Sequence, residues 1–265
     1  MLPALNAVSS DRRAAVRERL LRTGRAQVEG ILTESSAAAL YDLAREADYN
    51  VVTRRGTGHV DLPSAWLASL QPDQKRGLGE AIQKSAAADF QYLYDNYPVF
   101  DLVQDGLAEA PWRALAAFLN GDDFLGLMRE LTGEERIAMA DMQVTRYRAG
   151  HFLTEHDDHA EGKNRYFAYV LNLTPGWRID WGGLLAFHGE DGNVAEAFTP
   201  RFNTLNLLRV PTPHSVTQVA LSAGGDITRN RRWFRMRSCV TRPAAPAPTA
   251  QRFRSVRRPC QAYRR

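Results

Sequence analysis

Residues 151–165, HFLTEHDDHAEGKNR, hold three histidines and two adjacent aspartates within their first nine positions. His156 and Asp158 form an H-x-D pair. On an extended chain, residues i and i+2 point to the same face, so both side chains could reach one metal ion from the end of a strand. The pair alone is a weak signal, because solvated acidic loops also contain it by chance. A metal site here therefore needs a third ligand from a distant part of the chain.

The best candidate for that third ligand is His214. It is the one histidine of six that lies in a strand pattern, within NLLRVPTPHSVTQVAL. His156, Asp158 and His214 together would make the two-histidine, one-carboxylate triad of non-haem Fe(II) oxygenases. Such a triad holds the metal on one face. It leaves three coordination positions for a bidentate cosubstrate and O₂, which a fully ligated structural site cannot do.

A 2-oxoacid cosubstrate with a distal carboxylate needs a buried cation that can form a bidentate pair. The segment RRWFRMRSCV supplies arginines on a predicted strand after His214. Strand alternation puts Arg232 on a face whose other members are small or apolar, and we favour this arginine. Arg229 and Arg231 remain alternatives, because the preceding hairpin ALSAGGDITRN leaves the register open.

The other histidines are predicted to stay off the metal. His151 and His159 break the i, i+2 spacing, as does Asp157, so we expect them in a loop or behind the ligands. His188 follows a strand in AFHGEDG and reads as a turn residue, and His59 lies in a Gly-rich turn.

Helices are predicted first along the chain and strands afterwards. Helical patterns cover 10–23, closed by Gly24, and a second helix after an N-cap at Thr33 or Ser35. They continue over 73–94, 111–120 and 122–132, with short strands at 25–32 and 51–64. From about residue 138, some eight short apolar runs separated by Gly, Pro, Asn and Asp predict strands. This order predicts an α+β domain with a β-sandwich or barrel core and helices on one face.

Two details concern the region between the predicted ligands. Gly182-Gly183 predicts a backbone bend that lets a strand pass close to the site. Trp177 and Trp181, near the Pro-Gly turn that precedes this bend, are expected to pack rather than bind substrate.

The composition is that of a folded domain with a basic end segment. Of 265 residues 44% are apolar, and no apolar run approaches the ~18 residues of a membrane span. No secretory signal is evident, and two cysteines, Cys239 and Cys260, fit a reducing, cytoplasmic setting. The net charge is +4, but residues 242–265 contain seven arginines and no acid, so the rest of the chain carries 4 − 7 = −3. We expect this Pro/Ala/Arg-rich tail to be disordered. It could contact RNA, a ribosome or an acidic membrane surface, or serve only as a solubilising segment.

With these residues in place, the chain resembles the Fe(II)- and 2-oxoglutarate-dependent dioxygenases of the prolyl-hydroxylase type. RYRAGHFLTEHDDH is similar to that family's Y-x-x-G-x-x-x-x-x-H-x-D stretch, and PTPHSVTQV to its distal H-x-V histidine. RYFAYVLNLTPGWRIDWGGLLAF resembles the strand pair between them. The likeness spans roughly residues 28–240, and its helical half is similar to the ribosomal prolyl hydroxylases.

The resemblance implies a double-stranded β-helix, or jelly roll, with iron between its sheets. It implies Fe(II), 2-oxoglutarate, O₂ and ascorbate as cofactors and cosubstrates. Tyr147 would hydrogen-bond 2-oxoglutarate, and Arg232 would pair with its far carboxylate. The product would be a hydroxylated C–H, most readily on a prolyl residue in a protein or peptide, with succinate and CO₂ released. The chain would divide into a lead-in helix (1–27), a support region (28–136) forming one domain with the catalytic core (137–241), and the basic tail (242–265).

Two other functions are kept open. The same chemistry could act on a free amino acid or small metabolite, which the sequence barely distinguishes from a peptide. The chain could instead be a non-enzymatic RNA- or ribosome-binding module that uses its basic tail. A zinc hydrolase fits poorly, since no H-E-x-x-H or comparable motif is present.

Overall fold

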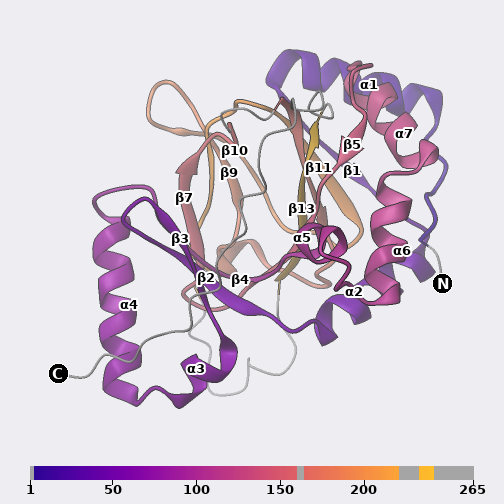
Figure 1. The fold of residues 1–265 in the computed structure, drawn as a ribbon. Coiled ribbons are helices and arrows are strands. Elements are labelled where there is room, and N and C mark those ends of the chain that lie inside the picture. The colour runs from indigo at the N-terminus through magenta and orange to yellow at the C-terminus, as the bar shows by residue number, and fades with distance from the viewer. Residues whose placement is uncertain (1–2, 160–163, 221–232, 242–265) are drawn as a thin grey trace, which may run out of the picture.

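The computed structural model of the chain describes residues 3–159, 164–220 and 233–241, the last of these as the backbone of one strand. Figure 1 shows α1, α2, α6 and α7 along one side of a strongly curved sheet, whereas α3 and α4 lie apart from them at the lower left. The helices are α1 (Ser10–Thr23), α2 (Glu34–Glu46), α3 (Ser64–Ser69), α4 (Pro72–Ala86), α5 (Val99–Gln104), α6 (Ala110–Leu119), α7 (Asp122–Thr132) and the 3₁₀ turn η1 (Ile179–Trp181). The strands are β1 (Arg25–Glu29), β2 (Asn50–Arg55), β3 (Gly58–Leu62), β4 (Tyr92–Tyr97), β5 (Met139–Ala140), β6 (Gln143–Tyr147), β7 (Phe152–His156), β8 (Arg165–Asn172), β9 (Leu185–His188), β10 (Val194–Phe198), β11 (Thr204–Arg209), β12 (His214–Val216) and β13 (Trp233–Thr241).

The helix ends follow the predicted capping residues. The Ser9 hydroxyl accepts a hydrogen bond from the Arg12 amide at the start of α1. Gly24 ends that helix with φ 70°, the left-handed conformation that favours glycine. Thr33, one of the two predicted N-caps, accepts from the Ser36 amide and starts α2. Local sequence therefore sets the ends of these two helices.

The strands form two runs that make the jelly roll. One run has the order β1-β11-β8-β13-β6-β4, and the other has the order β7-β12-β9-β10. Strand β4 joins them, because it pairs with both β6 and β7. Figure 1 shows α1, α2, α6 and α7 on one side and β7, β9 and β10 on the opposite side. This is the predicted α+β arrangement with helices packed on one face.

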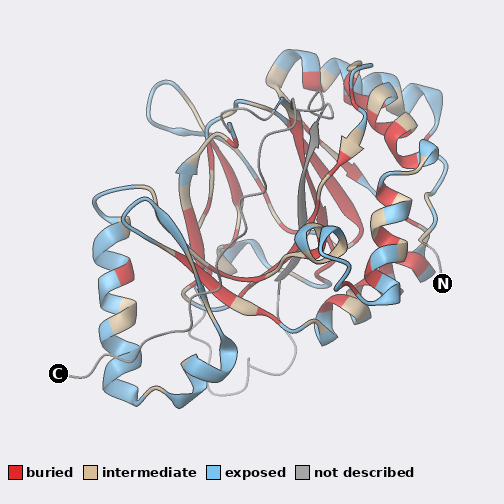
Figure 2. Cartoon of the chain, in the orientation of Figure 1, coloured by how far each residue is buried: buried red, intermediate tan, exposed pale blue. Residues whose placement is uncertain are grey.

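Buried residues lie in most strands and on the inward faces of the helices (Figure 2), whereas α4, β3 and β10 are mostly exposed. The larger core lies between the helices and the first run of strands, and includes Trp112, Met128 and Tyr169. A smaller cluster contains Tyr92, Tyr94, Tyr147, Leu153, Val216, Val219 and Val52. The second cluster matters for function, because it surrounds the predicted site residue Tyr147.

One predicted element was wrong. The helix expected over 73–94 ends at Ala86, and the aromatic stretch after it is strand β4. Phe90, Tyr92 and Tyr94 alternate with other residues, and this period of two places one aromatic face toward the interior of a sheet. Strands β1 to β4 also join the main sheet, so strands are not confined to the second half of the chain.

The domain boundaries stay a prediction. Within the described residues, every helix is too short or too polar to cross a bilayer.

Candidate metal centre

Three predicted ligands come together at the junction of β7 and β12. His156 ends β7, His214 begins β12, and the two residues are direct cross-strand partners. Their ring centroids lie 4.1 Å apart. The Asp158 carboxylate has Oδ1 at 3.5 Å from His156 Nε2 and Oδ2 at 3.4 Å from His214 Nε2. One ligand atom from each residue thus lies within 4.8 Å of the others.

Asp158 reaches the two imidazoles from the irregular segment after β7, whereas the sequence had suggested strand alternation. It lies beyond the end of β7 and has φ 61°, a left-handed conformation that costs a non-glycine residue roughly 1–3 kcal/mol. Its side chain is buried. A strained backbone that turns a buried carboxylate toward two histidines is typical of a functional site.

Backbone carbonyls fix which nitrogen of each imidazole faces the carboxylate. His156 Nδ1 lies 3.0 Å from the Thr154 carbonyl, and His214 Nδ1 lies 2.7 Å from the Thr212 carbonyl. A carbonyl only accepts, so each Nδ1 carries the hydrogen and each Nε2 presents a lone pair. Metal-bound imidazoles are held in this way.

The donor set fits a divalent iron. Two neutral imidazoles and one carboxylate form the facial triad of non-haem Fe(II) sites. Bonds of about 2.1 Å at right angles would separate ligand atoms by about 3 Å, close to the 3.4 and 3.5 Å found between the carboxylate and the two Nε2 atoms. These residues could hold the metal with only small adjustments of their side chains.

A row of aromatic rings leads from the metal ligands into the jelly roll. The Phe90 ring lies 5.8 Å from that of His156, followed by Tyr92 at 5.6 Å from Phe90. Tyr94 is 5.5 Å from Tyr92 and 5.3 Å from the ring of Tyr147. Tyr147 is buried at the inner end of the row, as a cosubstrate-binding residue would be. The sequence predicted Tyr92 as a core residue but did not place it or Phe90 in a row that leads to the triad, although their alternation was the signal that could have done so.

Tyr92 also links this row to the β2–β3 hairpin. Its hydroxyl lies 2.7 Å from His59 Nδ1. Burial is the largest cause that raises the pKa of Tyr92 to about 12, and the neighbouring Tyr94 adds to it. The phenol therefore stays protonated at neutral pH. His59 lies in β3 and not in a turn, which corrects the sequence prediction.

The predicted cosubstrate arginine, Arg232, lies outside the described residues, as do Arg229 and Arg231. The next residue begins β13, and the backbone of Trp233 pairs with Tyr147 of β6. Two positions further along, Arg235 pairs with Thr145 on one side and Asn172 on the other. The arginine-rich segment thus enters the sheet at the level of Tyr147.

Three further predictions concern residues beside the triad. His151 is buried, with Nε2 4.0 Å from a carboxylate oxygen of Asp95, and is not part of the ligand cluster. Burial lowers the pKa of His151 to about 4, although the Asp95 carboxylate opposes that shift. Asp157 accepts a hydrogen bond from the exposed His159 amide and also lies outside the cluster. His188 is not a turn residue: it ends β9, with Nδ1 2.5 Å from Glu155 and Nε2 2.8 Å from Ser215.

A buried ion-pair group lies next to Tyr147 on β6. The fully buried carboxylate of Asp95 accepts from Arg146 Nε at 2.6 Å and from Arg148 Nη2 at 2.7 Å. Because these arginines flank Tyr147, the group holds the strand segment that carries it against β4. The sequence did not reveal this pairing, since its partners are some fifty residues apart.

The predicted glycine bend is confirmed. Gly182 and Gly183 have φ 69° and 67°. A Cβ on Gly182 would lie only 2.0 Å from the Gln218 carbonyl oxygen, so the two chains pass at close range. The Ala220 amide donates to the Trp181 carbonyl, which holds this crossing together. Trp177 packs on the tyrosine cluster and donates to the Gly182 carbonyl at 2.9 Å, so it has the expected packing role.

Residues 142–234 match the family model described as the 2OG-Fe(II) oxygenase superfamily. The matched stretch contains Tyr147, His156, Asp158, His214 and Arg232. Residues 142–234 are thus similar to a 2OG-Fe(II) oxygenase domain. The family resemblance seen in the sequence is thereby confirmed.

The curated relatives are prolyl hydroxylases. Over 104 residues, the chain is 33% identical to Prolyl 3-hydroxylase OGFOD1 of Xenopus laevis, a match that covers 37% of this chain and 20% of that protein. It is 30% identical to Prolyl 3-hydroxylase OGFOD1 of Mus musculus over 104 residues, which covers 37% and 18%. The match thus spans about a fifth of the length of these relatives.

Solved structures confirm the double-stranded β-helix fold. A prolyl-4-hydroxylase from Pseudomonas putida has a TM-score of 0.54 and 20% identity, covering 87% of this chain and 98% of that chain. An oxidoreductase of the 2OG-Fe(II) oxygenase family from Burkholderia pseudomallei has a TM-score of 0.57 and 12% identity, covering 91% and 96%. At these identities, the likeness concerns the fold alone.

Proposed function

We propose that this protein is an Fe(II)- and 2-oxoglutarate-dependent dioxygenase that hydroxylates a prolyl residue in a protein or peptide. Succinate and CO₂ are the other products. The observation that carries the proposal is the convergence of His156, Asp158 and His214 within an oxygenase domain. Iron, when bound with 2-oxoglutarate and O₂, supplies the oxidising power for C–H hydroxylation.

The protein's own part is to position the reactants. His156 and His214 offer Nε2 to the metal, while the Thr154 and Thr212 carbonyls keep each imidazole in the required tautomer. Asp158 supplies the single negative charge from a buried side chain. These three residues would hold the metal and would leave coordination positions for cosubstrate and O₂.

Tyr147 and Arg232 are proposed to bind 2-oxoglutarate. Burial of Tyr147 at the inner end of the aromatic row supports a hydrogen bond from its hydroxyl to the cosubstrate. Arg232 is proposed to pair with the distal carboxylate, and Arg229 and Arg231 stay as alternatives. Arg235 serves as the control position for these substitutions, because it lies on the same strand and its backbone pairs with two buried polar residues, Thr145 and Asn172. Replacing each arginine by lysine should raise the KM for 2-oxoglutarate most at the true partner, since lysine cannot form the bidentate pair.

The prolyl substrate is supported by the names of the curated relatives. An oxygenase acting on a free amino acid or small metabolite is the alternative. Ascorbate dependence and a cytoplasmic location belong to the same proposal. The non-enzymatic alternative, an RNA- or ribosome-binding module, rests on the basic segment 242–265 and predicts no iron binding and steeply salt-dependent association.

Mass spectrometry would test the substrate class. The protein, with Fe(II), 2-oxoglutarate and ascorbate, should add one oxygen atom to a proline within a peptide or a protein from a cell extract. Free proline and other free amino acids are the matched controls. Oxygen added only to a free amino acid, or only to residues other than proline, would contradict the prolyl assignment and leave the oxygenase chemistry intact.

A further inference from the structure

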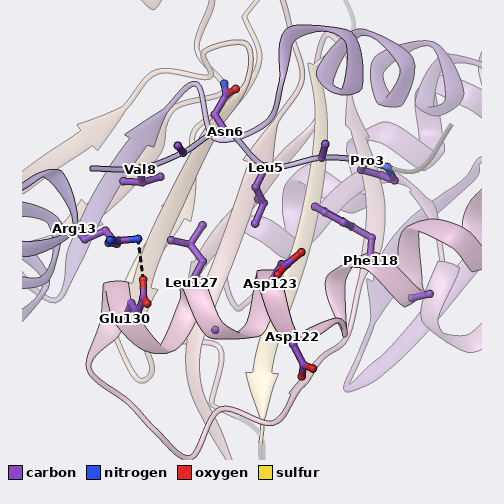
Figure 3. A pocket seen from close by; sticks show the side chains of 14 residues that line it. Pro3, Leu5, Asn6, Val8, Arg13, Phe118, Asp122, Asp123, Leu127 and Glu130 are labelled. Carbon is purple, nitrogen blue, oxygen red and sulfur yellow. Dashed lines mark ion pairs between the residues drawn. The ribbon is translucent and has the colours of Figure 1, made fainter. Parts of the chain in front are cut away.

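A groove lies on the helical side of the molecule, on the other face of the fold from β7 and its metal ligand. It has a volume of about 910 Å³ and runs between residues 3–8 and helices α6 and α7 (Figure 3). Leu5, Val8 and Leu127 give it an apolar floor, as Figure 3 shows. Asp122 and Asp123, both exposed, stand along its edge.

A second groove continues this surface on the far side of Pro3. It has a volume of about 670 Å³ and runs between α2 and α6. The charged residues that line the two grooves are five acids and one base: Asp42, Glu46, Asp122, Asp123, Glu130 and Arg13. Arg13 is already paired with Glu130, with Nη1 3.2 Å from Oε2. The helical face thus offers an apolar trough with a strongly acidic edge, and it fits an extended segment that is both apolar and basic.

The chain carries such a segment at residues 242–265, beyond the described part. It contains seven arginines and no acid, while the rest of the chain has a charge of −3. Pro243, Pro246 and Pro248 favour an extended backbone. Phe253 and Tyr263 offer large apolar side chains between the arginines.

This segment also begins beside the groove. Thr241, the last residue of β13, pairs with Met139 of β5. The neighbouring Ala140 is held by the Asn120 side chain, which donates to its carbonyl and accepts from its amide, both at 2.9 Å. Asn120 lies at the junction of α6 and α7, next to the acidic first turn of α7. Twenty-four extended residues reach up to about 80 Å, whereas α7 is only about 17 Å long.

We propose that residues 242–265 dock along the acidic grooves of α2, α6 and α7. The arginines pair with the acidic edge, and the aromatic and proline residues cover the apolar floor. Docking withholds the arginines from external polyanions such as RNA. The proposal is independent of the oxygenase activity.

Paramagnetic relaxation enhancement on the full-length chain tests this proposal. Cys239→Ser leaves Cys260 as the only thiol, and a nitroxide is attached there. We expect the label to broaden amide signals of residues 3–8 and of α6 and α7. The broadening should fall as salt is raised from 0.05 to about 0.5 M, because surface charge pairs are screened. It should also fall in the Asp122→Lys/Asp123→Lys variant.

The matched control is Asp73→Lys/Glu80→Lys, which makes the same charge change on exposed residues of α4. It should leave the broadening unchanged. Binding of a single-stranded RNA should tighten about threefold to tenfold in the Asp122/Asp123 variant and by less in the control.

Three results would overturn the proposal. The first is that the label broadens no amide signals, or broadens only those of residues outside the grooves, such as the β2–β3 hairpin. Broadening seen only between a labelled chain and a separate isotope-labelled chain would mean that a second copy occupies the groove. Equal RNA affinity in the wild type and both variants would mean that the arginines are not withheld.

Discussion

Substitution of Gly182 by alanine gives a sharp test of the packing against the segment that follows β12. Gly182 has φ 69° and ψ −151°, a region that essentially only glycine occupies. An added Cβ would meet the Gln218 carbonyl oxygen at 2.0 Å, where real Cβ atoms stay beyond 3.0 Å. The segment that must then move contains Val219, which packs in the tyrosine cluster around Tyr147.

Two costs add in this variant. The backbone conformation costs a non-glycine residue roughly 1–3 kcal/mol. Forcing a methyl group into a filled space costs roughly another 1–3 kcal/mol. We therefore expect Gly182→Ala to lower the free energy of unfolding by roughly 2–6 kcal/mol, a large share of the usual 5–15 kcal/mol.

Gly176→Ala is the matched control. Gly176 has φ 65°, but a Cβ there would meet nothing within 4 Å. It should lose only the conformational part, roughly 1–2 kcal/mol. Urea unfolding followed by circular dichroism would measure both variants. An equal loss in the two variants would refute the steric argument, and no loss in Gly182→Ala would refute the whole account of the crossing.

Three further predictions concern the groups around the site. Asp95→Asn should lower the free energy of unfolding by roughly 3–5 kcal/mol, because it leaves the Arg146 guanidinium buried without its counter-charge. The control Asp73→Asn removes an exposed ion pair, and it should change the free energy of unfolding by less than about 1 kcal/mol in the same urea titrations. The pKa of His151 is about 4 in the folded state and 6.5 in the unfolded state, so the unfolded state binds more protons between these pH values. The free energy of unfolding should therefore fall by about 3 kcal/mol as pH drops through that window. His151→Gln should flatten this part of the profile of stability against pH, and an unchanged slope would mean that another group is responsible. The Tyr92 phenol should ionise near pH 12, which would be seen as the difference between the ultraviolet titrations of wild type and Tyr92→Phe. A difference that already appears near pH 10 would contradict its burial.

Local signals in the sequence predicted much of the fold. Ser9, Gly24 and Thr33 cap their helices because each satisfies backbone groups within a few residues. The period-two pattern found most strands of the second half. It failed at Phe90, Tyr92 and Tyr94, because the helical pattern before them was extended too far.

Residue type and spacing grouped the three candidate metal ligands from the sequence, and the structure adds what spacing cannot give. The positive φ of Asp158 depends on the path of the chain after β7. The contacts of Asp95 with Arg146, and of His188 with Glu155, depend on which strands become neighbours. Pairings between distant segments have no local signature, so a single sequence could not predict them.

The most direct test of the central claim is succinate formation from 2-oxoglutarate, measured with Fe(II) and ascorbate in the presence of a cell extract. Wild type should turn over 2-oxoglutarate. In Asp158→Ala the rate of succinate formation should fall at least about a hundredfold, because the substitution removes the carboxylate of the triad. Asp157→Ala, which changes the adjacent residue outside the ligand cluster, should retain activity. Equal turnover in Asp158→Ala and wild type, or no turnover and no bound iron in wild type, would contradict the assignment of His156, Asp158 and His214 as an iron site.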